Sequence, residues 1–217
     1  MLKLDLQFFG GRGASSGGGG GGVTGIKESD ILETTSLVSQ RETQRELVDD
    51  TLAVFQDFYD EYGTQLEDIE LATLKPGASA LAYYSHDGVI AVNQSYFDNA
   101  KMGTAYADCV ASGFHPSNGN KTALQAVVAH EIGHKLTADV ATKLGHSDLH
   151  SAARTIVAEA TKRSGSKKSL ASSISGYAKK NHAETIAEAV SDVYCNGSKA
   201  SKASRAIVDV VNRYLKP

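Results

Sequence analysis

The spacing of apolar residues predicts a helix over residues 47–62. Apolar and aromatic side chains recur there three, four and seven residues apart, which places them on one face of an α-helix. They are Leu47, Val48, Leu52, Phe55, Phe58, Tyr59 and Tyr62. Gly63 follows at once, and glycine commonly ends helices. We therefore expect a helix whose apolar face packs on the core.

The pattern changes beyond residue 77 and then changes back. Residues 80–84 and 88–93 are short and rich in β-forming residues, and the turn signal His86-Asp87-Gly88 separates them, so two strands are expected. From Thr122 onward the spacing is helical again, interrupted first at Gly145. A helix, a few strands and then mostly helices are typical of an α+β fold.

Glycine marks a boundary near the amino terminus. Ten of the 21 glycines lie between Gly10 and Gly25, and such a run favours a flexible linker. We predict a tail and linker over 1–25 and one folded domain over 26–217. Before the glycines, apolar residues alternate with polar ones from Leu2 to Phe8, a pattern that forms a strand only against a partner. The tail is thus either a docking peptide on a tether or a disordered end.

Composition narrows the function classes. A net charge of −3 gives no broad basic field, which argues against nucleic acid as a partner. No stretch approaches the roughly 20 apolar residues of a membrane span, and Asp5 and Gln7 interrupt any signal-peptide core, so no membrane partner is expected. Cys109 and Cys195 form no disulfide framework, and we expect reduced thiols inside a cell.

The segment that predicts chemistry is His130-Glu131-Ile-Gly-His134. Two histidines four residues apart lie on one face of a helix, so both imidazoles can bind one ion. Glu131 is rotated by one position and can take a proton from a water beside the metal, as a zinc hydrolase requires. The alternative is a structural helix with two incidental histidines.

The surroundings of this motif favour the metal site. Apolar residues flank it on a helix of about 15 residues, with Asn120 or Thr122 as a plausible N-cap. Gly133 lowers helix propensity by about 1 kcal/mol relative to alanine, which makes sense if another segment approaches closely there.

A catalytic zinc needs a third protein ligand, and two regions could supply it. The nearer one holds His146 and His150 with Asp148 between them. The better candidate is an acidic stripe of Glu184, Glu188 and Asp192, one helical turn apart from each other. Like charges at this spacing repel unless a cation or histidines face them, although a solvated acidic face is the ordinary alternative. A carboxylate on this stripe, Glu188 or Asp192, could also fix the tautomer of a histidine ligand.

The motif helix together with Tyr177-x-x-x-Asn181-x-x-Glu184 resembles the catalytic domain of anthrax toxin lethal factor and its relatives, which are zinc metallopeptidases of the gluzincin type. The resemblance covers about residues 88–196. It implies a zincin-like fold, mostly helical, with a small sheet beside the motif helix. The resemblance implies that His130, His134 and Glu184 bind zinc and that Glu131 is the general base. It also implies that Tyr177 donates a hydrogen bond to the substrate carbonyl or leaving group, and that Glu188 supports a histidine ligand.

The first residues, LKLDLQFFGGRGASSGGGG, resemble the openings of tailed-phage minor head and morphogenesis proteins. This resemblance implies a phage-encoded protein in the host cytoplasm or on the virion, with phage head components as partners through the tail.

Two hypotheses follow from these features. In the first, the protein is a zinc-dependent endopeptidase that acts on a protein or peptide substrate, and phage head proteins are one such substrate class. In the second, it is a virion structural or head-morphogenesis protein that carries a metallopeptidase-like fold. A structural role has no physical need for two histidines, a base and a third ligand together, so we favour the first.

Elemental analysis tests the metal prediction. The chain purified without added metal should contain about one zinc ion per molecule, because two histidines and a glutamate suit zinc. Glu184→Ala should lose most of that zinc. An unchanged zinc content in this variant would contradict the assignment of Glu184.

Overall fold

The computed structural model describes residues 7–10, 28–65, 69–78, 80–85, 88–166 and 168–216. The strands are β1 (Gln7–Gly10), β2 (Ile31–Ser36), β3 (Ile69–Leu74), β4 (Ala80–Tyr84) and β5 (Ile90–Asn93). The helices are α1 (Arg45–Tyr62), α2 (Asn99–Ala111), α3 (Ala123–Leu144), α4 (Leu149–Ser164), α5 (His182–Asn196) and α6 (Lys202–Leu215). Among the short 3-10 helices, η5 (Tyr177–Lys179) precedes α5.

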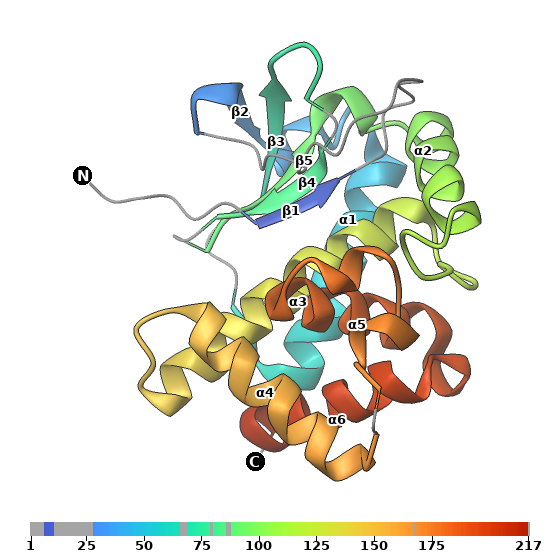
Figure 1. The fold of residues 1–217 in the computed structure, drawn as a ribbon. Coiled ribbons are helices and arrows are strands. Elements are labelled where there is room, and N and C mark those ends of the chain that lie inside the picture. Colours follow the sequence, from blue (N-terminus) through green and yellow to red (C-terminus); the bar gives the residue numbers. More distant parts are fainter. Residues whose placement is uncertain are drawn as a thin grey trace.

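The strands form one mixed sheet, the upper layer in Figure 1. Its order is β1-β4-β5-β3-β2; β3 and β5 are parallel, and the other neighbours are antiparallel. Successive side chains of a strand point to opposite faces. On β4, Tyr84 therefore joins the core shared with the helices, whereas Tyr83 packs with a smaller cluster on the other face.

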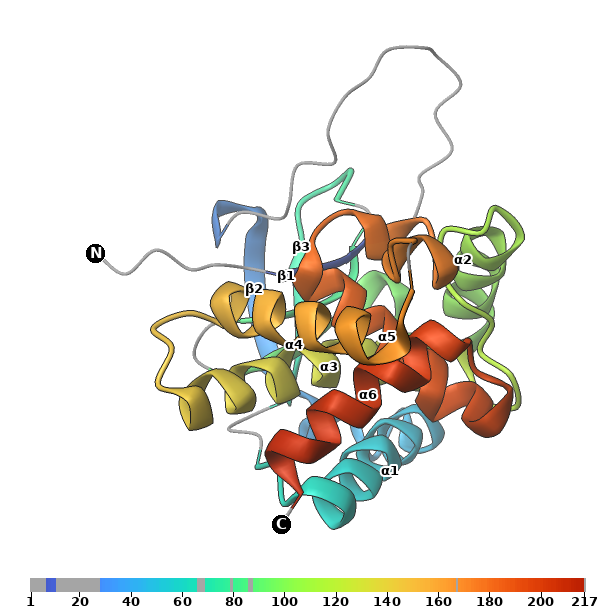
Figure 2. The ribbon, with the colours of Figure 1, turned by 60° about the horizontal axis from the view of Figure 1, so that its bottom comes forward.

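Helix α3 lies between the sheet and the helices α4, α5 and α6, whereas α2 lies beside the sheet (Figures 1 and 2). It contacts β4 and β5 above, and packs most extensively against α5 below. Helices α1, α4 and α6 complete the lower layer around this pair. The arrangement is the α+β, zincin-like fold expected from the sequence, mostly helical with a small sheet beside the motif helix.

Several predicted boundaries are confirmed. Helix α1 ends at Gly63, which takes the left-handed φ of 65°. Helix α3 ends in the same way at Gly145. At its start Thr122, and not Asn120, is the N-cap, in a capping box with Gln125.

The sequence analysis did not predict the strands β2 and β3 or the helix α2. The predicted turn residues His86 and Asp87 lie outside the described residues.

The predicted tail coincides only in part with described residues. Gln7–Gly10 form β1, paired with β4, so the alternating pattern has found the partner that a strand requires. The rest of the predicted tail and linker lies outside the described residues.

Two further expectations can be compared with the fold. Cys109 and Cys195 are buried and form no disulfide, as expected. None of the described helices combines the length and the apolar character that crossing a bilayer requires.

Gly133 explains how α3 and α5 come so close. A Cβ atom added to Gly133 would lie 2.7 Å from Cα of Ala187 and 3.2 Å from Cβ of Val190. Real Cβ atoms do not approach a backbone atom to 2.7 Å, so any larger residue would push the helices apart. The close approach predicted for this glycine is confirmed.

Replacing Gly133 should therefore destabilise the protein. Gly133→Ala is expected to lower the free energy of unfolding by about 1 to 3 kcal/mol, because the overpacking outweighs alanine's better helix propensity. The matched control is Gly103→Ala within α2, where an added Cβ meets nothing within 4 Å. The control should raise stability by about 0.5 to 1 kcal/mol. Urea unfolding of both variants measures this; equal stabilisation by both would contradict the packing argument.

Candidate metal centre

Helix α3 carries the three residues of the histidine motif into the interior. His130, Glu131 and His134 are all fully buried. The two imidazoles lie one helical turn apart, with ring centroids 5.0 Å apart. Tyr84 of β4 stacks beside the His134 ring at 6.5 Å, so the sheet forms one wall of the site.

Helix α5 supplies the carboxylate that meets these imidazoles. Asn181 caps the helix by accepting a hydrogen bond from the Glu184 backbone N–H at 2.9 Å, which fixes Glu184 in the first turn. Glu184 Oε2 lies 3.2 Å from Nε2 of His130 and 3.4 Å from Nε2 of His134. The three possible ligand atoms lie within 4.8 Å of one another.

The donor set fits a divalent cation. Two imidazole nitrogens and a carboxylate oxygen converge on one buried point, and this combination is a common zinc ligand set. Burial by itself would raise the pKa of Glu184, but both histidines outweigh it and hold that pKa well below its usual range. Burial would likewise lower the pKa of His130, yet Glu184 and Glu188 raise it to about 10. The carboxylates thus make this point favourable for positive charge.

Glu131 is buried in a way that a structural role does not explain. Neither of its carboxylate oxygens has a hydrogen-bond partner among the described residues. Burial raises its pKa to about 8, and Glu184 and Glu188 add to the rise although His130 opposes it. An unsatisfied buried carboxyl group costs stability. Glu131 lies one residue after His130, at the ligand cluster. A role in proton transfer there would explain why a carboxyl group is buried at this position without a hydrogen-bond partner.

Glu188 fixes the orientation of His130. The His130 Nδ1–H group donates to Glu188 Oε1 at 2.9 Å, which leaves Nε2 to face the ligand cluster. Ser175 donates to the other oxygen, Oε2, at 2.6 Å. Of the two carboxylates that could orient a histidine, Glu188 therefore contacts His130 and Asp192 does not. Asp192 accepts hydrogen bonds from Ser201 and Ser204 at the start of α6.

His115 is the residue of the site that sequence reasoning missed. It is buried, and its Nδ1 donates to the same Glu188 oxygen at 3.0 Å. Burial would raise the pKa of Glu188, but His115 and His130 outweigh it and hold that pKa at about 2. His115 lies in the connection between α2 and α3, where no periodic pattern or motif spacing sets it apart. Only the fold brings it to Glu188, 73 positions along the chain.

Tyr177 lies against the histidines from η5. Its ring centroid is 5.9 Å from that of His130 and 5.3 Å from that of His115. Burial and the nearby Glu184 raise the pKa of Tyr177 far above its usual value, so it keeps its O–H proton. Lys180 donates to the Tyr177 hydroxyl oxygen at 3.2 Å. The tyrosine is therefore a protonated hydrogen-bond donor beside the ligand cluster.

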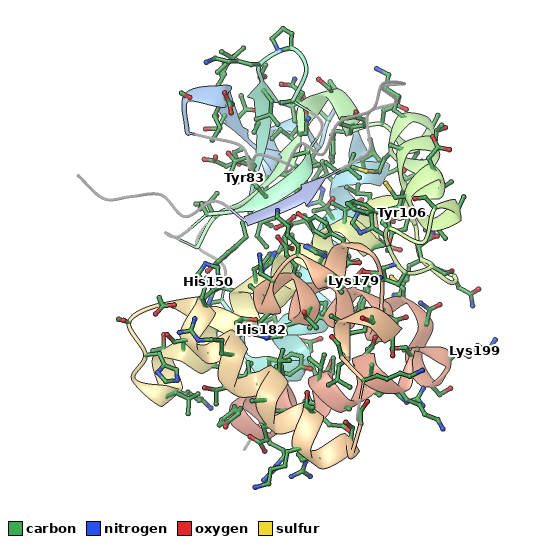
Figure 3. All side chains as sticks on the ribbon, viewed as in Figure 1. Tyr83, Tyr106, His150, Lys179, His182 and Lys199 are labelled. Atoms are coloured by element: carbon green, nitrogen blue, oxygen red, sulfur yellow. The ribbon has the colours of Figure 1, made fainter. Side chains whose placement is uncertain are left out.

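Two backbone hydrogen bonds hold the Tyr177 segment in place. The N–H of Gly176 donates to the carbonyl of Gly113 at 2.8 Å, and that of Tyr177 to the carbonyl of Phe114 at 3.0 Å. The connection that carries His115 thus also positions Tyr177. Lys179 at the end of η5 and His182 at the start of α5, both labelled in Figure 3, are exposed.

The nearer rivals for the third ligand lie elsewhere. Asp148 caps α4 by accepting the Ser151 backbone N–H at 2.9 Å. Neither His146 nor His150 belongs to the ligand group that the described residues form, which consists of His130, His134 and Glu184.

Comparison with known proteins gives one match. The family model described as "Peptidase family M48" matches residues 39–205, which include every residue of the site discussed above. No curated protein and no solved structure matches the chain. The narrower resemblances, to lethal factor and to phage proteins, stay predictions.

The hydrogen bond from His115 to Glu188 should strengthen zinc binding. His115→Leu removes a donor to Glu188 and should weaken zinc binding about 10- to 100-fold, because Glu188 then orients His130 less firmly. His115→Asn, which can still offer an N–H group to Glu188, should lose less. Competition with a chelator measures the dissociation constant.

A matched control separates this effect from general destabilisation. Ser191→Ala removes a different buried hydrogen bond of α5. This bond joins α5 to α3, from Ser191 Oγ to the carbonyl of Ala126 at 2.8 Å. It should lower stability and leave zinc affinity unchanged. If His115→Leu behaves in the same way as this control, His115 has only a structural role.

Proposed function

The chain belongs to peptidase family M48, and we propose that within this family of zinc metallopeptidases it acts as an endopeptidase. One observation carries the proposal: Nε2 of His130, Nε2 of His134 and Oε2 of Glu184 converge on a single buried point. We assign these three atoms as the zinc ligands. The unsatisfied carboxyl group of Glu131 beside them supports its assignment as general base.

A zinc ion bound there would polarise a peptide carbonyl and lower the pKa of a bound water. Glu131 removes a proton from the water that attacks the carbonyl carbon. Burial raises the pKa of Glu131, and the positive charge of a zinc ion beside it would lower that pKa, so Glu131 can accept the proton as a carboxylate and later release it. Glu131 then delivers the proton to the nitrogen of the departing amine.

Tyr177 stabilises the negative charge that develops on the carbonyl oxygen. Its hydroxyl group keeps its proton, and the nearby Lys180 ammonium makes that proton a stronger donor. Glu188 takes no part in proton transfer in this proposal. It orients His130, and Ser175 and His115 in turn orient Glu188.

Cleavage within a chain, rather than at its end, is supported by the sheet. Strand β4 contacts α3, and Tyr84 near the end of β4 lies beside His134. A peptide extended along β4 would therefore run past the ligand cluster. The substrate class is a protein or peptide.

The finer statement on origin rests on the first residues alone. Their resemblance to phage head proteins supports a phage-encoded enzyme in the host cytoplasm or on the virion. A purely structural role finds less support, because burying Glu131 without a partner is costly in a scaffold.

The variant Glu131→Gln tests the proposed chemistry. It should bind zinc as well as the unsubstituted chain and lose about 10²- to 10⁴-fold in the rate of casein hydrolysis, because the amide cannot accept the proton. Mass spectrometry of the fragments distinguishes internal cleavage from trimming of the ends. A zinc-loaded chain that cleaves casein equally well with glutamine at this position would refute the role of Glu131.

A further inference from the structure

The outer edge of β4 faces the candidate metal centre. Strand β4 pairs with β5 along one edge, and its other edge lies on the side of α3. Tyr84, at the end of β4, stacks on His134. An extended peptide that added to this edge would form main-chain hydrogen bonds and pass directly beside the ligand cluster.

In this structure the chain's own amino-terminal segment occupies that edge. Gln7–Gly10 pair antiparallel with β4, in a register that sets Gln7 opposite Tyr84 and Phe9 opposite Ala82. Strand β1 also contacts α3, the helix with the histidine motif. Figure 1 shows β1 at the lower margin of the sheet, between β4 and the helices that carry the ligands.

Strand β1 is separated along the chain from the rest of its sheet. It ends at Gly10, and the described residues resume at Glu28. The sequence that follows β1 is rich in glycine, a composition typical of linkers. A short strand joined to the domain by such a sequence resembles a ligand attached to its own binding site.

We infer that residues 7–10 occupy the outer edge of β4 as an intramolecular competitor of the extended peptide substrate. The inference rests on the proposed function, since it places the competitor at the proposed catalytic site. For a glycine-rich link of this kind, the local concentration is on the order of 1 mM. A segment that bound in trans with a Kd of about 0.1 mM would then weaken a competing peptide about tenfold.

Proline substitutions in the full chain remove the competitor without shortening it. Phe8→Pro combined with Phe9→Pro eliminates two adjacent N–H groups, so pairing with β4 is lost whichever of the two faces it. The matched control places the same two prolines at Ala14 and Ser15, outside β1. All chains carry Glu131→Gln for binding measurements, so that no probe is cleaved.

The first measurement is independent of activity. A fluorescent peptide of sequence LKLDLQFFG, which is residues 2–10, is titrated with each zinc-loaded chain, and anisotropy reports binding. The chain with prolines at 8 and 9 should bind it about tenfold more tightly than the unsubstituted chain and the control. Equal affinity for all three chains would overturn the inference, whether or not the protein is a peptidase.

The second measurement uses the same chains with Glu131 intact and an internally quenched peptide substrate. The prolines at 8 and 9 should lower KM about tenfold and leave kcat unchanged, and LKLDLQFFG should inhibit competitively. An unchanged KM would overturn the inference and leave the proposed function standing. Peptide binding as expected with no hydrolysis by any zinc-loaded chain would instead overturn the proposed function.

Sedimentation of the unsubstituted chain checks that the pairing is intramolecular. A monomer is expected at all concentrations. A dimer that dissociates when prolines replace Phe8 and Phe9 would show that β1 reaches the β4 edge of a second copy, and would overturn the intramolecular arrangement.

Discussion

The close approach of α3 and α5 is the constraint on which the site depends. The two helices meet where Gly133 faces Ala187, two residues 54 positions apart along the chain. Because neither residue has a side chain larger than a methyl group, the backbones lie close enough for Glu184 to reach between His130 and His134. A larger side chain at this crossing would separate the carboxylate from the imidazoles. The crossing of α3 and α5 at Gly133 and Ala187 therefore determines both the packing of the two helices and the geometry of the candidate metal centre.

Charge is the second constraint. Glu131, Glu184 and Glu188 are all buried around His130 and His134, and so many carboxylates in a low-dielectric interior are costly unless positive charge faces them. His115 supplies part of the compensation by donating to Glu188, which His130 also does. A divalent cation at the ligand cluster would supply the rest. The connection that carries His115 also holds Tyr177 through the backbone, so one irregular segment positions both a support for His130 and a hydrogen-bond donor.

The sheet relates this centre to the rest of the chain. Its strand β4 contributes Tyr84 to the wall of the site and offers an edge for an extended peptide. The chain's own β1 pairs with this edge, so residues 7–10 lie next to the strand whose Tyr84 stacks beside His134. In the proposed arrangement, peptide access to the candidate metal centre and the position of β1 are two aspects of one surface.

Features that depend on local periodicity could be predicted from the amino-acid sequence. Helical spacing predicted α1, put His130 and His134 on one face of α3, and placed Glu184 and Glu188 on a common stripe of α5. It did not reveal β2, β3 or α2, although Met102, Tyr106 and Cys109 of α2 recur at helical spacing. Resemblance, rather than spacing, singled out Glu184 from its neighbours on the stripe. The packed fold was needed to show that Glu188 and not Asp192 contacts His130, that His115 joins them, and that β1 pairs with β4. These contacts join residues far apart along the chain, and their partners are set by how whole elements pack, which no local pattern encodes.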